Sequence, residues 1–128
     1  MTTRKLVALN ASIEATTGVA LIVDPGCVVR VLLGDRPSDS GIAVGRVAGL
    51  GLLSLGLASW PSEDNATVHA TRALFIYNLL TALYLGYLRI GRGVSGYLLS
   101  PAFGLHVFLT LLLARPVLRG HDRNMVPS

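Results

Sequence analysis

The segment YLLSPAFGLHVFLTLLLA, residues 97–114, contains no formally charged side chain. A helix needs roughly 17–25 mainly apolar residues to cross the hydrocarbon core of a bilayer, and this segment meets that length. Similar apolar blocks lie at 6–23, 41–60 and 72–90. The sequence therefore predicts an all-α, polytopic membrane protein with four transmembrane helices.

The composition agrees with a chain that is solvated mainly by lipid. Apolar residues make up 52% of its 128 residues and charged residues only 14%, whereas soluble domains carry about 25% charged residues. The length allows one domain, 1–128. The net charge is +4, and Lys and Arg mostly sit at the ends of the apolar blocks rather than in a basic stripe, so the bilayer is the expected partner and nucleic acid is excluded.

A short helix is expected at 25–33, directly after the first span. Asp24 is a good N-cap, Pro25 suits the first helical position, and Gly34 is a helix stop. Apolar residues recur at helical spacing in this segment, which favours an interfacial helix on the bilayer surface, with an ordinary loop as the alternative. Ser38 or Asp39 is expected to cap the second span, and residues 115–128 to form a basic tail.

The orientation follows from the positive charges that flank the spans. Six Lys and Arg residues fall on one predicted side and four on the other: Arg4, Lys5, Arg72, Arg115, Arg119 and Arg123 against Arg30, Arg36, Arg89 and Arg92. Since the more positive side faces the cytoplasm, both termini are expected to be cytoplasmic.

The chain has no pattern that predicts a metal, a cofactor or a catalytic residue. His69, His106, His121 and the single Cys27 are scattered, so no metal-ligand spacing occurs. GRGVSG at 91–96 matches a dinucleotide-binding fingerprint, but it follows a long apolar helix instead of a strand and reads as a turn. Haem held by His106 would require a second histidine from another copy of the chain.

Each apolar block nevertheless carries a strongly polar side chain. On the first, Glu14 shares a helical face with Asn10 and Thr17, and lipid can satisfy none of these groups. The polar residues predicted to face the interior of the bundle from the other three blocks are Arg46, Asn78 beside Tyr77, and His106 with Thr110 on its face. The sequence predicts that these side chains form one intramembrane cluster.

Two states of Glu14 are compatible with the sequence. An ion pair with Arg46 would offset the cost of a charge in the membrane, about 3 kcal/mol on insertion scales. Alternatively, Glu14 is protonated or uses His106 or Asn78 as a partner. Polar groups of this kind serve either function or interhelical packing. Pro101 is expected to kink the fourth span one turn before His106.

Small residues on the second span predict close helix packing. Gly41, Gly45 and Gly49 form two overlapping G-x-x-x-G matches, which let another backbone approach. The partner is either a helix of the same chain or a second protomer.

Four segments carry a resemblance to known proteins: LVALNASIEATTGVALIVDPGCVVRVLLG (6–34), GRVAGLGLLSLG (45–56), YNLLTALYLGY (77–87) and SPAFGLHVFLTLLLA (100–114). Together they resemble a group of small bacterial four-helix membrane proteins, which are similar to DoxX-like proteins in size and helix count. The resemblance implies a location in the bacterial inner membrane and transfers no functional residue.

The leading functional hypothesis is a non-enzymatic membrane protein, either a homo-oligomer or a subunit of a larger membrane complex. Its polar cluster would fix packing and offer a place for a small lipophilic ligand. A proton-coupled carrier of small molecules that uses Glu14 is the first alternative. A quinone-linked redox protein is the second, although the chain has no cofactor signature.

Overall fold

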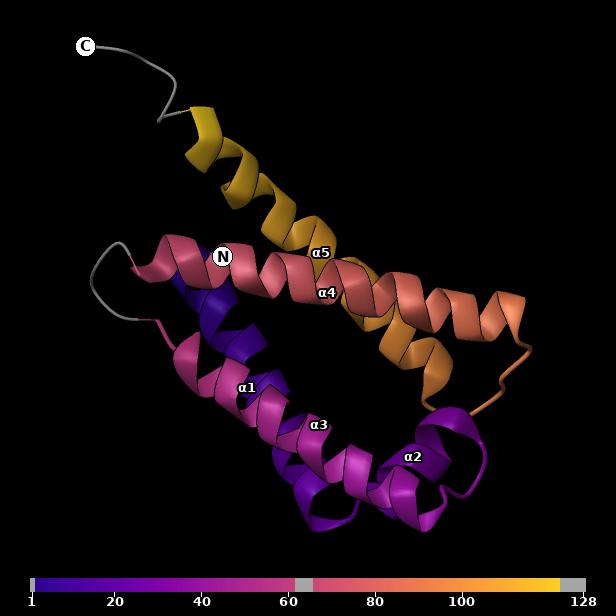
Figure 1. The fold of residues 1–128 in the computed structure, drawn as a ribbon. Coiled ribbons are helices and arrows are strands. Elements are labelled where there is room, and N and C mark those ends of the chain that lie inside the picture. Colours follow the sequence, from indigo (N-terminus) through magenta and orange to yellow (C-terminus); the bar gives the residue numbers. More distant parts are fainter. Residues whose placement is uncertain (1, 62–65, 123–128) are drawn as a thin grey trace.

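The computed structural model describes residues 2–61 and 66–122, and within these ranges the chain forms helices and no strand. Five helices follow one another in the described residues: α1 (Thr3–Val23), α2 (Pro25–Leu33), α3 (Asp39–Ala58), α4 (Ala66–Gly91) and α5 (Leu99–Asp122). Figure 1 shows their arrangement. The predicted all-α fold class is confirmed.

Four of the helices are long and apolar enough to cross a membrane. In the described residues these stretches are Thr3–Val23, Asp39–Ala58, Thr67–Gly91 and Leu99–Leu118. α4 begins before the predicted position 72, and α5 continues through residue 122 although Pro116 lies within it. The first part of the predicted tail 115–128 is therefore helical, and residues 123–128 lie outside the described ranges.

The ends of α2 have the predicted caps. The Asp24 carboxylate accepts a hydrogen bond of 2.9 Å from the Cys27 N–H. Pro25 occupies the first turn, where the backbone N–H that proline lacks would have no partner within the helix. Gly34 ends the helix in the left-handed conformation, with φ of 87°. Ser38, one of the two residues predicted to cap the second span, accepts from the Gly41 N–H at 3.2 Å.

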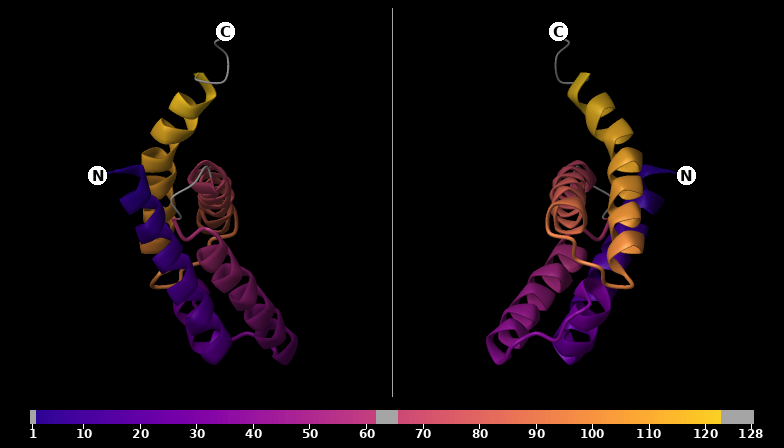
Figure 2. Two further views of the ribbon diagram at one scale, coloured as in Figure 1. Left: turned by 90° about the vertical axis from the view of Figure 1, so that its left-hand side faces the viewer. Right: turned by 90° about the vertical axis from the view of Figure 1, so that its right-hand side faces the viewer.

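The long helices associate in two antiparallel pairs, α1 with α3 and α4 with α5. Contacts between the pairs are fewer and come mainly from α1, which touches both α4 and α5. α3 and α4 diverge toward the end of the molecule where α2 lies (Figure 1). The views in Figure 2 show the C-terminal part of α5 extending beyond the other helices. The two pairs thus meet along α1.

Backbone-to-backbone contact holds α1 against α3. A Cβ atom on Gly18 would lie 2.5 Å from the Leu53 nitrogen, and one on Gly49 would lie 2.7 Å from the Gly18 carbonyl oxygen. Further along, a Cβ on Gly56 would lie 2.6 Å from the Ala11 carbonyl oxygen. Carbon atoms do not approach at such distances, so this interface requires glycine at three positions.

These contacts identify the partner of the glycines that the sequence singled out on the second span. Gly49 packs on α1 of the same chain, and Gly45 packs on Pro25 at the start of α2. Gly41 lies against Pro37 and the Ser38 side chain, which belong to the connection just before α3, so within the described chain it packs on no other helix. The intrachain alternative is the correct one for this face.

The connection between α4 and α5 packs against α2 at one end of the molecule. The Leu98 N–H donates a hydrogen bond of 3.0 Å to the Val31 carbonyl oxygen. Gly96 lies against the Leu32 carbonyl group so closely that a side chain there would overlap it. The ends of the two helix pairs are therefore joined through α2.

The apolar core lies where α1, α4 and α5 meet. Leu6 and Val7 of α1, Leu74 of α4 and Leu113 of α5 are buried against one another. Leu74 is one helical turn from Asn78, so this core adjoins the polar residues described next.

Candidate functional site

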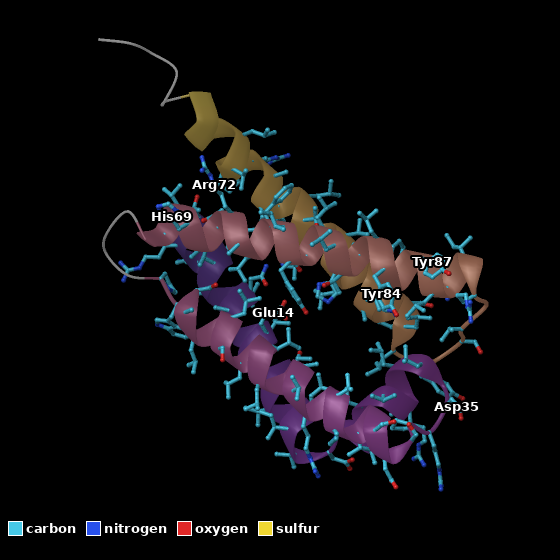
Figure 3. The ribbon with its side chains drawn as sticks, viewed as in Figure 1. Glu14, Asp35, His69, Arg72, Tyr84 and Tyr87 are labelled. Carbon is cyan, nitrogen blue, oxygen red and sulfur yellow. The ribbon has the colours of Figure 1, made fainter. Side chains whose placement is uncertain are left out.

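Polar side chains from three helices meet in the middle of the molecule. We call the group of Asn10 and Glu14 from α1, Tyr77 and Asn78 from α4, and His106 from α5 the three-helix polar cluster. Asn10 and Asn78 are fully buried and Glu14 is 1% exposed. Figure 3 shows Glu14 at the centre of the fold, between α1 and α4. The structure thus brings together five of the residues predicted to form the intramembrane cluster.

One backbone carbonyl orients the hydrogen bonds of the cluster. The Asn78 Nδ2 donates to the Leu74 carbonyl oxygen at 2.7 Å, and because a carbonyl only accepts, the orientation of the Asn78 amide is fixed. The same nitrogen donates its second hydrogen to the Asn10 Oδ1 at 3.3 Å. Asn78 therefore links α4 to α1 through its nitrogen and leaves its oxygen for α5.

The orientation of Asn78 also determines which ring nitrogen of His106 carries hydrogen. The His106 Nδ1 lies 2.8 Å from the Asn78 Oδ1, which is an acceptor, so Nδ1 must be the donor. In the uncharged imidazole, Nε2 then has the free lone pair. Tyr77 packs its ring edge-on to the imidazole, with centroids 5.8 Å apart, and its hydroxyl lies beside the Glu14 carboxyl group.

Two buried polar atoms of the cluster have no hydrogen-bond partner within the described part of the chain. They are the Nδ2 of Asn10 and the Oε1 of Glu14, a donor and an acceptor one helical turn apart on α1. Leaving a buried polar group unpaired costs about 1–3 kcal/mol. A molecule that accepts from Asn10 and donates to Glu14 would recover that free energy at both atoms.

Arg46 does not belong to the cluster. Its side chain is exposed on α3, whereas Glu14 is buried on the side of α1 that faces α4 and α5. The hypothesis that Arg46 faces inward and pairs with Glu14 is therefore wrong. The reason is the glycine face of α3: Gly45 and Gly49 take the inward positions, and Arg46 follows on the outer side.

The two threonines of the predicted sites bond within their own helices. The Thr17 hydroxyl donates to the Ile13 carbonyl at 2.9 Å, and the Thr110 hydroxyl donates to the His106 carbonyl at 2.7 Å. Both hydroxyls are thus satisfied locally and neither bonds another helix. Thr17 lies beside the cluster without taking part in its hydrogen bonds.

The kink expected at Pro101 is absent from the described α5. The helix begins at Leu99, so Pro101 occupies its first turn, where a missing N–H breaks no intrahelical bond. The carbonyl that such a kink would have freed near His106 is not available to the cluster.

Sequence reasoning missed the packing roles of Gly18 and Gly56 and the orienting carbonyl of Leu74. Gly56 lies seven residues after Gly49 and so on the same helical face, a signal that was present in the sequence. The role of Leu74 depends on its main-chain carbonyl group, which no feature of the sequence could have indicated.

The described residues hold no group of three or more His, Cys, Asp or Glu side chains placed to bind a metal ion. When the chain is compared with family models, curated proteins and solved structures, none of them matches it. Its function is therefore inferred from the three-helix polar cluster and from the four long apolar helices of a membrane protein.

Proposed function

We propose that the protein is a non-enzymatic integral membrane protein whose three-helix polar cluster binds a small lipophilic ligand. The observation that carries this proposal is the unpaired donor on Asn10 beside the unpaired acceptor on Glu14, both buried. A ligand with a hydroxyl or primary amide head satisfies both atoms, and its apolar remainder suits the helices around them. The protein acts as a homo-oligomer or as a subunit of a larger membrane complex.

The proposed setting is the bacterial inner membrane, with both termini in the cytoplasm. The excess of Lys and Arg on that predicted side supports the orientation. Within this setting α2 lies on the opposite membrane surface, supported by its apolar residues and by its contact with the α4–α5 connection.

Two substitutions of Glu14 test the ligand site. Glu14→Gln keeps an acceptor oxygen, so we expect it to retain a bound ligand, whereas Glu14→Leu removes the acceptor and should lose the ligand. The measurement is native mass spectrometry of the gently extracted protein with added 1-decanol, and with decane as the probe that lacks a head group. The same spectra report the number of copies in the assembly.

Arg46→Gln is the matched control, because it removes a charge from an exposed position outside the cluster. It should bind 1-decanol as the unchanged protein does. Equal binding of 1-decanol and decane, or unchanged binding after Glu14→Leu, would contradict the proposed ligand site.

A proton-coupled carrier is the second candidate, and the position of Glu14 favours it. The carboxyl group lies near the middle of α1, which is the helix that joins the two helix pairs. Intramembrane carboxyl groups at such places serve in proton relays. In liposomes, a carrier would lose pH-dependent uptake on Glu14→Gln while its folding stayed intact, so this variant separates the two functions.

A further inference from the structure

An apolar groove lies between α4 and α5 on the outside of the protein. Its volume is about 480 Å³, within the range of roughly 300–1,000 Å³ typical of small-molecule sites. Ala82 and Gly86 of α4 and Phe103 and Val107 of α5 form part of its walls. Leu111, also on the wall, is 65% exposed, so the groove is open on the outer surface of the α4–α5 pair.

The depth of the groove depends on a missing side chain. A Cβ atom on Gly86 would lie 3.1 Å from the Phe103 Cε2, so the aromatic ring rests over the glycine. Thr110 is the polar residue of the wall, and its hydroxyl is already bonded to the His106 carbonyl. The walls of the groove therefore offer only apolar contacts to a bound molecule.

A positive charge lies one helical turn beyond the groove, in the last turn of α4. Arg89 follows Gly86 by three residues and Ala82 by seven, which places it on the same side of α4. Its guanidinium donates a hydrogen bond to the hydroxyl of Ser100, which precedes Phe103 by three residues on α5. Within the described ranges no carboxylate pairs with Arg89, and its side chain is exposed.

We propose that this groove binds one acyl chain of an anionic phospholipid of the bilayer, with its phosphate group at Arg89. A hydrocarbon groove that ends at a cation on the membrane surface is complementary to an amphiphile with a negative head. A second copy of the chain fits less well. Two-fold contact across the groove would bring the two Arg89 side chains, each one helical turn beyond it, close to each other, and like charges repel.

Filling the groove tests the acyl-chain site. Val107→Phe places a ring in the groove, whereas Val47→Phe makes the same change on α3 at a position that is 69% exposed and outside it. We expect native mass spectra of the unchanged protein with phosphatidylglycerol to show one retained lipid. Val107→Phe should lose this adduct and Val47→Phe should keep it. Equal adducts in both variants would overturn the proposal.

Removing the charge tests the head-group contact without filling the groove. Arg89→Gln should lower the preference for phosphatidylglycerol over phosphatidylcholine about fivefold, which corresponds to about 1 kcal/mol for one arginine near the surface. Arg36→Gln, an exposed arginine between α2 and α3, is the control and should leave the preference unchanged. The comparison of Arg89→Gln with Arg36→Gln tests the lipid site even if Val107→Phe fails to fold.

Two further results would also overturn the lipid site. The first is binding of both lipids with equal affinity by the unchanged protein. The second is conversion of a dimer to a monomer by Val107→Phe while lipid binding stays the same, which would make the groove an interface between copies. Neither result bears on Glu14, so this proposal and the proposed function fail separately.

Discussion

Gly49→Leu is expected to separate α1 from α3 and to lower the free energy of unfolding by about 3 kcal/mol or more. Overpacking a core typically costs about 1–3 kcal/mol because side chains can adjust. Here the first atom of the new side chain would already meet the Gly18 carbonyl oxygen at 2.7 Å, and a backbone cannot turn aside as a side chain does. The measurement is SDS-induced unfolding in mild detergent, followed by circular dichroism.

Gly51→Leu is the matched control for this prediction. It introduces the same side chain two residues away on α3, where a Cβ atom would meet no atom of another helix within 4 Å. Its unfolding curve should coincide with that of the unchanged protein to within about 0.5 kcal/mol. If Gly49→Leu were as stable as Gly51→Leu, the close contact of α1 with α3 would be wrong.

Asn78→Leu is expected to have the second largest effect, a loss of about 2–3 kcal/mol of stability. The variant deprives both Asn10 and His106 of their hydrogen-bond partner and leaves two more polar groups unpaired, one on the buried Asn10 and one on the half-buried His106. Each such group costs about 1–3 kcal/mol, although interhelical hydrogen bonds in membranes average only about 0.6 kcal/mol. The cost of an unpaired group is the one that applies to Asn78→Leu, because the polar groups of Asn10 and His106 remain in the protein without a partner.

The triple variant Asn10→Leu, Asn78→Leu, His106→Leu separates these effects. Replacing all partners by apolar groups leaves nothing unpaired along this chain of hydrogen bonds, so the triple variant should regain part of the stability that Asn78→Leu loses. A triple variant that is less stable than Asn78→Leu alone would show that the three side chains do not act as one network. The same unfolding assay applies.

The long helices were predictable because lipid imposes a simple rule on sequence. In lipid, backbone polar groups must be satisfied within the helix and most side chains must be apolar, so a span appears as a long, mainly apolar block. The 97–114 block, which has the length of a span and no formally charged side chain, is the clearest example. The caps of α2 were predictable for a local reason as well, since Asp24, Pro25 and Gly34 act on groups within a few residues of themselves.

The cluster was predictable in its members and only partly in its partners. Polar residues within apolar blocks point inward because lipid offers them no hydrogen bond, and this correctly identified Glu14, Asn78 and His106. The same rule failed for Arg46. Close packing of α1 on the glycines of α3 determines how α3 is rotated about its axis. This rotation turns the glycines inward and Arg46 outward.

The contacts of Asn10 and Glu14 also bear on the order in which the protein is made. Synthesis starts at the N-terminus, and α1 can pair with α3 once residue 58 has left the ribosome, because their glycine contacts lie wholly within that part of the chain. Asn10 first meets Asn78 twenty residues later, and His106 joins after that. During this interval the nascent chain holds a carboxyl-bearing helix whose later neighbours are still in the ribosome. We expect the tight α1–α3 pair, whose glycine contacts involve neither α4 nor α5, to hold α1 in place until those helices are made.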